Sequence, residues 1–174
     1  EEAQVYLSKA KAITPENASV GWNTARLMLL KQRAFEALKV ARQTTQRYPN
    51  DVEGMGVLGA CLRANNRITD SMEVLNRAIE LKPNYAEALI NRGLIRLSQK
   101  NKTEALADLE LAHRLKPHIR QIWHLVISLK IEAQEFSGAI SFLEEMIEAD
   151  PKNESLWGAL ARCYYAINNF HSAL

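Results

Sequence analysis

Residues 86–117 show the pattern of apolar and polar positions that recurs along the chain. Two amphipathic stretches are joined by a short polar turn and followed by a proline, which predicts a pair of α-helices. The other segments are variations on this unit. The chain has five prolines, each 34 residues after the previous one: Pro15, Pro49, Pro83, Pro117 and Pro151. A fixed period of this size is typical of helical repeat arrays, so we expect an all-α chain of antiparallel helix pairs.

The period predicts how the chain is divided. We expect residues 1–174 to form a single array, in which 1–17 is the second helix of a partial repeat and 154–174 is another partial repeat. The four complete repeats are 18–51, 52–85, 86–119 and 120–153. In the last segment we expect one helix, a turn at Asn168–Asn169 and only the start of a second helix. Apolar residues at the two ends should be partly exposed: Val5, Leu7, Phe170 and Leu174.

Polar residues near the helix starts are candidates for N-caps. Asn50 is placed to cap the first helix of the second repeat, with Glu53 three residues later in capping-box spacing. Thr69 is placed to cap the second helix of the same repeat.

Small residues fall at fixed places in the period. Ala25, Gly59, Gly93 and Ala161 share one place in the first helix, and Ala37, Ser71, Ala105 and Ala139 share one in the second. Small side chains are needed where two helices approach closely, because larger ones would push the axes apart.

The chain resembles the tetratricopeptide repeat (TPR) family in several features. These are the small residues at fixed places, the 34-residue period, Trp123 and Trp157 near the start of a first helix, Leu58–Gly59 and the closing prolines. The resemblance extends over essentially the whole chain. It implies a right-handed superhelix (an α-solenoid) whose concave groove is lined mainly by the first helix of each repeat. It also implies a scaffold that docks peptide segments of other proteins. The pentatricopeptide RNA-binding array is excluded, because its period is one residue longer and it needs a basic groove.

The composition limits the kinds of partner that we expect. A net charge of +2 argues against a dedicated nucleic-acid surface, and no apolar run approaches membrane-spanning length. We therefore expect no nucleic-acid partner and no membrane insertion. The start of the chain shows no signal-peptide pattern, which favours the cytoplasm without fixing the compartment.

The charge is unevenly distributed. Residues 18–51 carry six Lys or Arg and two Asp or Glu, whereas residues 120–153 carry three Lys or Arg and six Asp or Glu. Solvated outer faces would explain this difference. The alternative is that opposite ends attract, so that copies of the chain associate head to tail.

The sequence provides little for catalysis, and we expect no enzyme activity, no cofactor and no metal site. His113, His118 and His124 are spaced by five and six residues, which does not place them on one helix face. The chain has no Gly-rich phosphate loop. Cys61 and Cys163 lie three periods apart, beyond disulfide reach, and we expect buried thiols.

If the family geometry holds, first-helix residues line the groove. The candidate partner-binding residues are Trp22, Asn23, Arg26, Arg63, Ile90, Asn91, Leu94, Leu97, His124, Ser128, Arg162 and Tyr165. For Trp22, packing against a neighbouring repeat is an equal alternative. The carboxylate clamp of chaperone-binding members is not matched. The asparagine ladder of O-linked N-acetylglucosamine transferases is matched only at Asn23 and Asn91, which suggests contacts to a peptide backbone there.

Arg92 and Arg96 occupy places that more often hold core residues in the family. They either extend their charged ends to the surface or form a small cationic site for an acidic partner.

From these features we predict a non-catalytic scaffold that binds a peptide segment of a protein partner in the concave groove. One alternative is the substrate-presenting portion of a larger multidomain enzyme, such as a glycosyltransferase or other group-transferase. A third is self-association through the open repeat ends.

Overall fold

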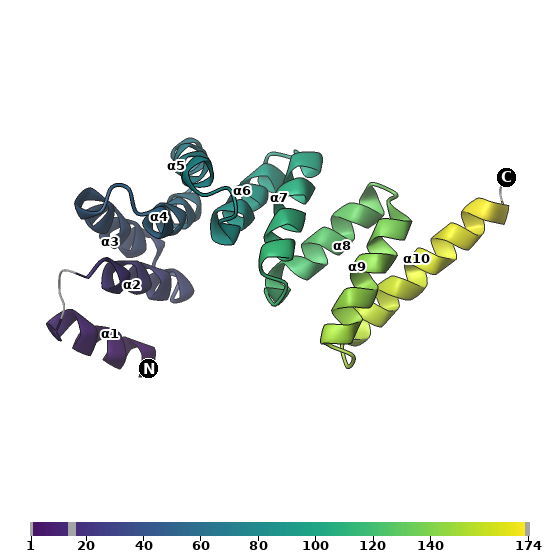
Figure 1. Cartoon of the computed structure of the whole chain (residues 1–174), viewed down its shortest axis with the longest axis horizontal. Coiled ribbons are helices and arrows are strands. Elements are labelled where there is room, and N and C mark those ends of the chain that lie inside the picture. The colour runs from purple at the N-terminus through teal and green to yellow at the C-terminus, as the bar shows by residue number, and fades with distance from the viewer. Residues whose placement is uncertain (1, 14–16, 173–174) are drawn as a thin grey trace. The chain divides into compact units, whose positions relative to one another are not determined.

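The computed structural model describes residues 2–13 and 17–172, with side chains described for 2, 5, 6, 9, 10, 13 and 17–168. Within these ranges the chain is helical and contains no β-strand, so the predicted all-α arrangement of antiparallel helix pairs is confirmed (Figure 1). The elements are α1 (Glu2–Ile13), α2 (Ala18–Leu30), α3 (Ala34–Arg47), α4 (Val52–Ala64), α5 (Ile68–Leu81), α6 (Ala86–Ser98), α7 (Lys102–Leu115), the 3₁₀ turn η1 (Arg120–Ile122), α8 (Trp123–Glu132), α9 (Phe136–Ala149) and α10 (Glu154–Ser172).

The helices form two compact units, unit 1 up to Leu115 and unit 2 from Lys116. In unit 1 each helix from α2 to α7 packs on the next, and the first helices of successive repeats also pack on one another, α2 on α4 and α4 on α6. Within residues 17–115, no contact of comparable extent joins α3 to α5 or α5 to α7. The layer of α2, α4 and α6 is therefore the inner layer of a curved stack, and α3, α5 and α7 form the outer layer.

Small residues lie where the helices of unit 1 meet, as predicted, but Ala161 at the equivalent place on α10 is exposed. Ala25, Ala37 and Ala105 are fully buried. At Gly59, a Cβ atom would lie 2.5 Å from Leu75 Cδ2, which is closer than two carbon atoms can approach. Leu75 on α5 therefore occupies the space that a side chain at Gly59 would need.

The turn inside each repeat uses a left-handed residue that is not glycine. Gln32, Asn66, Lys100 and Gln134 have φ between 57° and 63°, and they are spaced by one period. The amide of the following residue donates to a carbonyl five residues earlier, for example Asn101 N to Arg96 O at 2.9 Å. This is the Schellman arrangement that ends a helix, and glycine is the residue it favours.

Replacing Lys100 with glycine should therefore stabilise the protein. The left-handed conformation costs a non-glycine residue about 1–2 kcal/mol, and the extra flexibility of glycine in the unfolded chain offsets about half of this. We expect the free energy of unfolding to rise by about 0.5–1 kcal/mol in urea denaturation. Gln99→Gly is the matched control, because Gln99 has φ −87° and should lose stability instead. Equal losses in the two variants would contradict this account of the turn.

The helix starts differ from the predicted caps. The N-cap of α4 is Asp51, one residue after Asn50, and its Oδ1 accepts from Glu53 N at 3.0 Å. Thr69 lies inside α5, whose N-cap is Arg67 without a side-chain cap bond. The spacing rule placed both caps wrongly because it cannot tell at which residue the helical dihedral angles begin.

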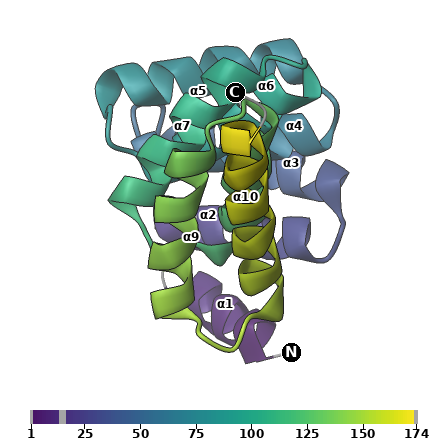
Figure 2. The same cartoon turned by 90° about the vertical axis from the view of Figure 1, so that its right-hand side faces the viewer.

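In unit 2, α8 packs on α9, and α9 packs on α10. Figure 2 shows α9 and α10 side by side. α10 continues to Ser172, so the turn expected at Asn168–Asn169 is wrong. At the other end of the chain, Val5 is 52% exposed, as predicted. The side chains of Leu7, Phe170 and Leu174 lie outside the described residues.

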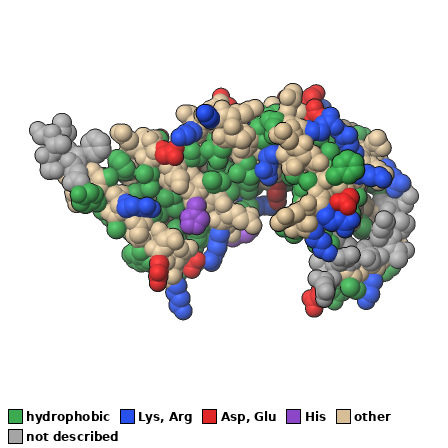
Figure 3. Space-filling model, turned by 180° about the vertical axis from the view of Figure 1, so that it is seen from behind, with side chains coloured by type: hydrophobic (Ala, Val, Ile, Leu, Met, Phe, Trp, Pro, Cys, Tyr) green, Lys and Arg blue, Asp and Glu red, His purple; other side chains and the backbone are tan. Residues whose placement is uncertain are grey.

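The uneven charge of the sequence appears on the surface of unit 1. In Figure 3, blue Lys and Arg side chains gather over unit 1, on the right of that view, with green hydrophobic side chains between them. On α3, Lys39, Arg42 and Arg47 are all exposed.

Candidate partner-binding surface

The inner layer of unit 1 carries a mixed polar and apolar surface, which we call the inner face. It is formed by Asn23, Arg26, Arg63, Ile90, Asn91, Leu94 and Leu97, all predicted as binding residues and all at least partly exposed. At one end, Arg26 Nη1 donates to Glu53 Oε1 at 2.7 Å and to Asn23 Oδ1 at 3.3 Å. At the other end, α6 presents three partly exposed apolar side chains, Ile90, Leu94 and Leu97.

The two asparagines of the inner face are each engaged within unit 1. Asn91 Nδ2 donates to Glu87 O on its own helix at 2.9 Å, and Asn23 Oδ1 accepts from Arg26. Each amide keeps further hydrogen-bonding capacity, since a carboxamide has two N–H donors and two acceptor lone pairs.

Arg63 is the cation of the inner face that has no acidic partner. Its Nε is buried and has no hydrogen-bond acceptor, and no described carboxylate pairs with its guanidinium. Burial lowers the pKa of Arg63, because the charged form loses hydration. The equivalent position one repeat later is Leu97, so Arg63 is placed next to the apolar end of the inner face.

Trp22 does not belong to this surface, and its prediction as a binding residue is wrong. Its side chain is completely buried. The indole packs where a Cβ on Gly54 would be, only 2.1 Å from Trp22 Cζ2, and its Nε1 donates to Asp51 Oδ2 at 2.6 Å. Gly54 thus provides the space that draws Trp22 into the contact between α2 and α4.

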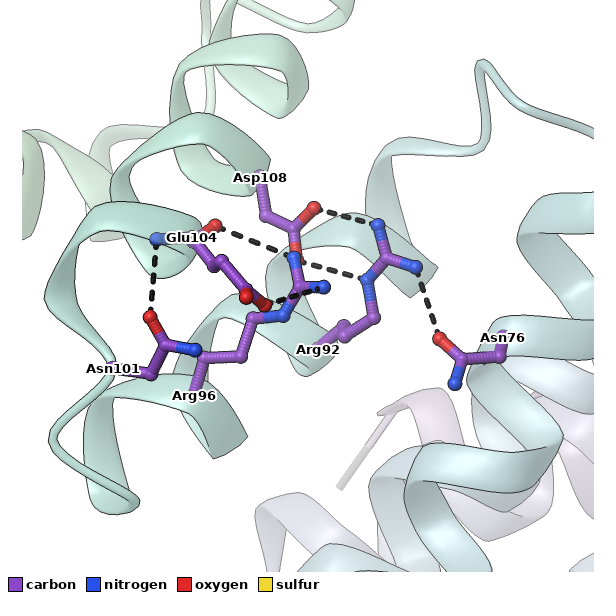
Figure 4. A network of polar contacts seen from close by, with 6 residues as sticks. All are labelled: Asn76, Arg92, Arg96, Asn101, Glu104 and Asp108. Atoms are coloured by element: carbon purple, nitrogen blue, oxygen red, sulfur yellow. Dashed lines mark hydrogen bonds and ion pairs between the residues drawn. The ribbon is translucent and has the colours of Figure 1, made fainter.

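Arg92 and Arg96 form an internal ion network rather than either arrangement predicted for them (Figure 4). Arg92 holds Asp108 with two hydrogen bonds, from Nε to Oδ2 at 2.9 Å and from Nη2 to Oδ1 at 2.8 Å. Arg96 Nη1 contacts Oδ2 of the same carboxylate at 2.6 Å, and its Nη2 pairs with Glu104 at 2.9 Å. The side chain of Asp108 is only 6% exposed.

This network joins three helices. Asn76 on α5 accepts from Arg92 Nη1 at 2.9 Å, so the arginine bridges α5, α6 and α7. Since both guanidinium groups are occupied by residues of unit 1, they do not provide a cationic site for a partner. They hold the second and third repeats together.

The remaining predicted binding residues belong to unit 2. His124 and Ser128 lie on α8, Arg162 and Tyr165 lie on α10, and all four are exposed. Trp123 is buried at 3% exposure, whereas Trp157 at the equivalent place is 51% exposed. Both indoles donate to a proline carbonyl six residues earlier, Trp157 to Pro151 O at 3.0 Å.

The two cysteine thiols are poor nucleophiles in this fold. Cys61 and Cys163 are free and buried, as predicted, and burial raises the pKa of Cys61 to about 12. In the part of the chain that the structure describes, no three His, Cys, Asp or Glu side chains cluster as metal ligands would. None of the described helices combines the length and hydrophobicity that crossing a bilayer requires.

Family models match three parts of the chain. Two are described as tetratricopeptide repeat, at residues 86–119 and 130–174, and one as TPR repeat, at residues 59–100. Together they cover more than half of the sequence. The chain belongs to the TPR family. TPR proteins generally act as protein-interaction scaffolds.

Curated TPR relatives are distant and much longer. Protein FlbA of Caulobacter vibrioides is 23% identical over 84% of this chain and 25% of its own length. Tetratricopeptide repeat protein 6 of Homo sapiens is 27% identical over 71% of this chain and 23% of its own length. The chain thus spans about a quarter of the length of the curated relatives it matches.

Solved structures share the TPR fold. The complex described as Naa15/Naa10 bound to HypK-THB matches with a TM-score of 0.79 and 21% identity, over 90% of this chain and 24% of that chain. PilF of Pseudomonas aeruginosa matches with a TM-score of 0.75 and 19% identity, over 99% and 78%. A protein of Thermus thermophilus, described as a thermophilic TPR protein, matches with a TM-score of 0.72 and 20% identity, over 91% of this chain and 87% of that chain.

Proposed function

We propose that this TPR segment is a non-catalytic docking module whose inner face binds a peptide segment of a partner protein. The partner segment would place an acidic side chain against Arg63 and apolar side chains against Ile90, Leu94 and Leu97. The observation that carries the proposal is that Arg63 Nε is buried without an acceptor among the described residues, and that no described carboxylate pairs with this guanidinium. The Arg63 side chain is partly exposed, so a carboxylate from a partner could pair with its guanidinium.

The neighbouring charges agree with such a segment. Arg26 is neutralised by Glu53, with an N–O distance of 2.7 Å, so Arg63 is the cation of this face that is left to attract an acid. Half-buried apolar side chains beside a charged anchor are typical of binding patches. The likeness to a structure described as a TPR protein with an unusual peptide-binding site is a further reason to test peptides.

Peptides selected from a random phage-displayed library against the immobilised chain provide the test. The selected peptides should contain an acidic residue beside apolar ones, and Arg63→Ala should weaken their binding roughly tenfold in fluorescence polarisation. Leu94→Ala should weaken binding to a smaller extent. Arg77→Ala is the matched control, because it removes an exposed arginine of α5 that pairs only with Glu80. Unchanged affinity for both the Arg63 and Leu94 variants would refute the inner face as the site.

A further inference from the structure

The outer surface of α3 differs from the outer surfaces of the other second helices. Its exposed stripe contains Phe35, Lys39, Arg42 and Gln46, spaced three to four residues apart so that they lie on one helix face. One, two and three periods later, the same places hold Thr69, Glu73, Asn76 and Glu80; Thr103, Ala107, Glu110 and Arg114; and Ser137, Ser141, Glu144 and Glu148. Among these stripes, α3 alone combines an aromatic residue with cations and no acid.

Phe35 is the exposed aromatic residue of this stripe. It is 76% exposed, although the equivalent residues are hydroxylic. Next to it is an open hollow of about 250 Å³ lined by Phe35, Leu38, Lys39, Arg42, Gln43 and Gln46, which we call the outer patch. A second hollow of about 400 Å³ continues from Arg42 and Gln46 towards Leu58 on α4. An apolar side chain of a partner could therefore enter the hollow and pack against Phe35.

The cations of the outer patch are available to a partner. Lys39 and Arg42 form no ion pair among the described residues, whereas the nearby Arg33 is bound to Glu36 at 2.8 Å. The repeat that contains them has a balance of six basic to two acidic residues. Opposite charge on a partner would both steer its approach and fix its orientation.

We propose that the outer patch on α3 is a second docking surface, which takes an acidic amphipathic helix of another protein. Acidic side chains on the partner helix would pair with Lys39 and Arg42, and one large apolar side chain would lie in the hollow against Phe35 and Leu38. The amides of Gln43 and Gln46 provide polar contacts at the rim. This surface is separate from the inner face, since it lies on an outer-layer helix and uses none of the inner-face residues.

A fluorescein-labelled helical peptide with glutamates every three to four positions and one leucine stripe tests the outer patch. Binding to the whole chain, followed by fluorescence anisotropy, should weaken roughly tenfold in Lys39→Glu/Arg42→Glu and should fall with added salt. Phe35→Thr, which installs the residue found at positions 69 and 103, should weaken binding severalfold. The same peptide with lysine in place of glutamate should not bind.

Arg77→Glu is the matched control, because it reverses an exposed charge on the next outer helix and should leave binding unchanged. Circular dichroism of every variant checks that the helices are intact. An equal loss in Arg77→Glu, or no loss in the α3 variants, would overturn the proposal. So would sedimentation showing that the α3 variants abolish self-association, because the surface would then bind a second copy. Arg63→Ala should retain binding to this peptide, which separates failure here from failure of the inner-face proposal.

Discussion

Trp22→Ala should lower the free energy of unfolding by about 3–5 kcal/mol, the range for truncating a large buried aromatic side chain. The indole is fully enclosed between α2 and α4 and packs against Gly54. Alanine would leave a cavity there, and Asp51 would lose the 2.6 Å hydrogen bond from the indole. Urea denaturation monitored by circular dichroism measures the change.

Trp157→Ala is the internal comparison for this prediction. Trp157 is 51% exposed, so its truncation should cost less than about 1.5 kcal/mol. If the two variants lose similar stability, the burial of Trp22 is not what holds the first two repeats together. If Trp22→Ala keeps its stability and loses only peptide binding, Trp22 is a surface residue.

Asp108→Val should cost about 3 kcal/mol, because it removes the carboxylate that neutralises two largely buried arginines. The side chains of Arg92 and Arg96 are only 17% and 18% exposed, so neither guanidinium could recover full hydration after the change. Glu104 would still pair with Arg96, but Arg92 would keep only Asn76. The melting temperature and the urea midpoint should both fall.

The second repeat suggests the control for this experiment. It has Leu58 and Val74 where the third repeat has Arg92 and Asp108. Arg96 would still lack Asp108, so the double variant Arg92→Leu/Asp108→Val should regain part of the lost stability, since apolar pairs often replace buried ion pairs without loss. A double variant that is as unstable as Asp108→Val alone would show that the ion network has no apolar substitute.

Much of the fold could be predicted from the sequence, because the repeat period averages out local ambiguity. Five prolines in register mark the helix ends, and the apolar spacing predicts the pairs that the structure contains. Caps were less predictable, because Asn50 and Asp51 are equally good cap residues and only the backbone dihedral angles distinguish them.

The errors in the site have identifiable physical causes. Trp22 is one place later in the period than Trp123 and Trp157, so the period alone did not assign it to the core. The missed signal was Gly54 on the next helix, which leaves room for the indole. For Arg92 the missed signal was Asp108, an acid in a column that holds valine in the first two repeats. Both errors come from examining one helix without the helix that faces it.

Two features of the candidate surfaces could not be derived from the columns. Arg63 was predicted to line the groove, but only the structure reveals that its Nε is buried without an acceptor among the residues it describes. Phe35 was not recognised, although Thr69, Thr103 and Ser137 at equivalent places could have indicated an unusual aromatic residue. Whether an anomalous residue is buried or exposed depends on its neighbours across the helix layers.

The outer helices of unit 1 have little contact with one another, whereas the inner helices pack in an unbroken row. A change on the outer side of one repeat therefore requires no matching change in the next. Evolution can alter the recognition chemistry of each outer helix independently, while the shared inner row preserves the curvature. The cationic stripe of α3 beside the acidic and hydroxylic stripe of α5 is what such independent variation would produce.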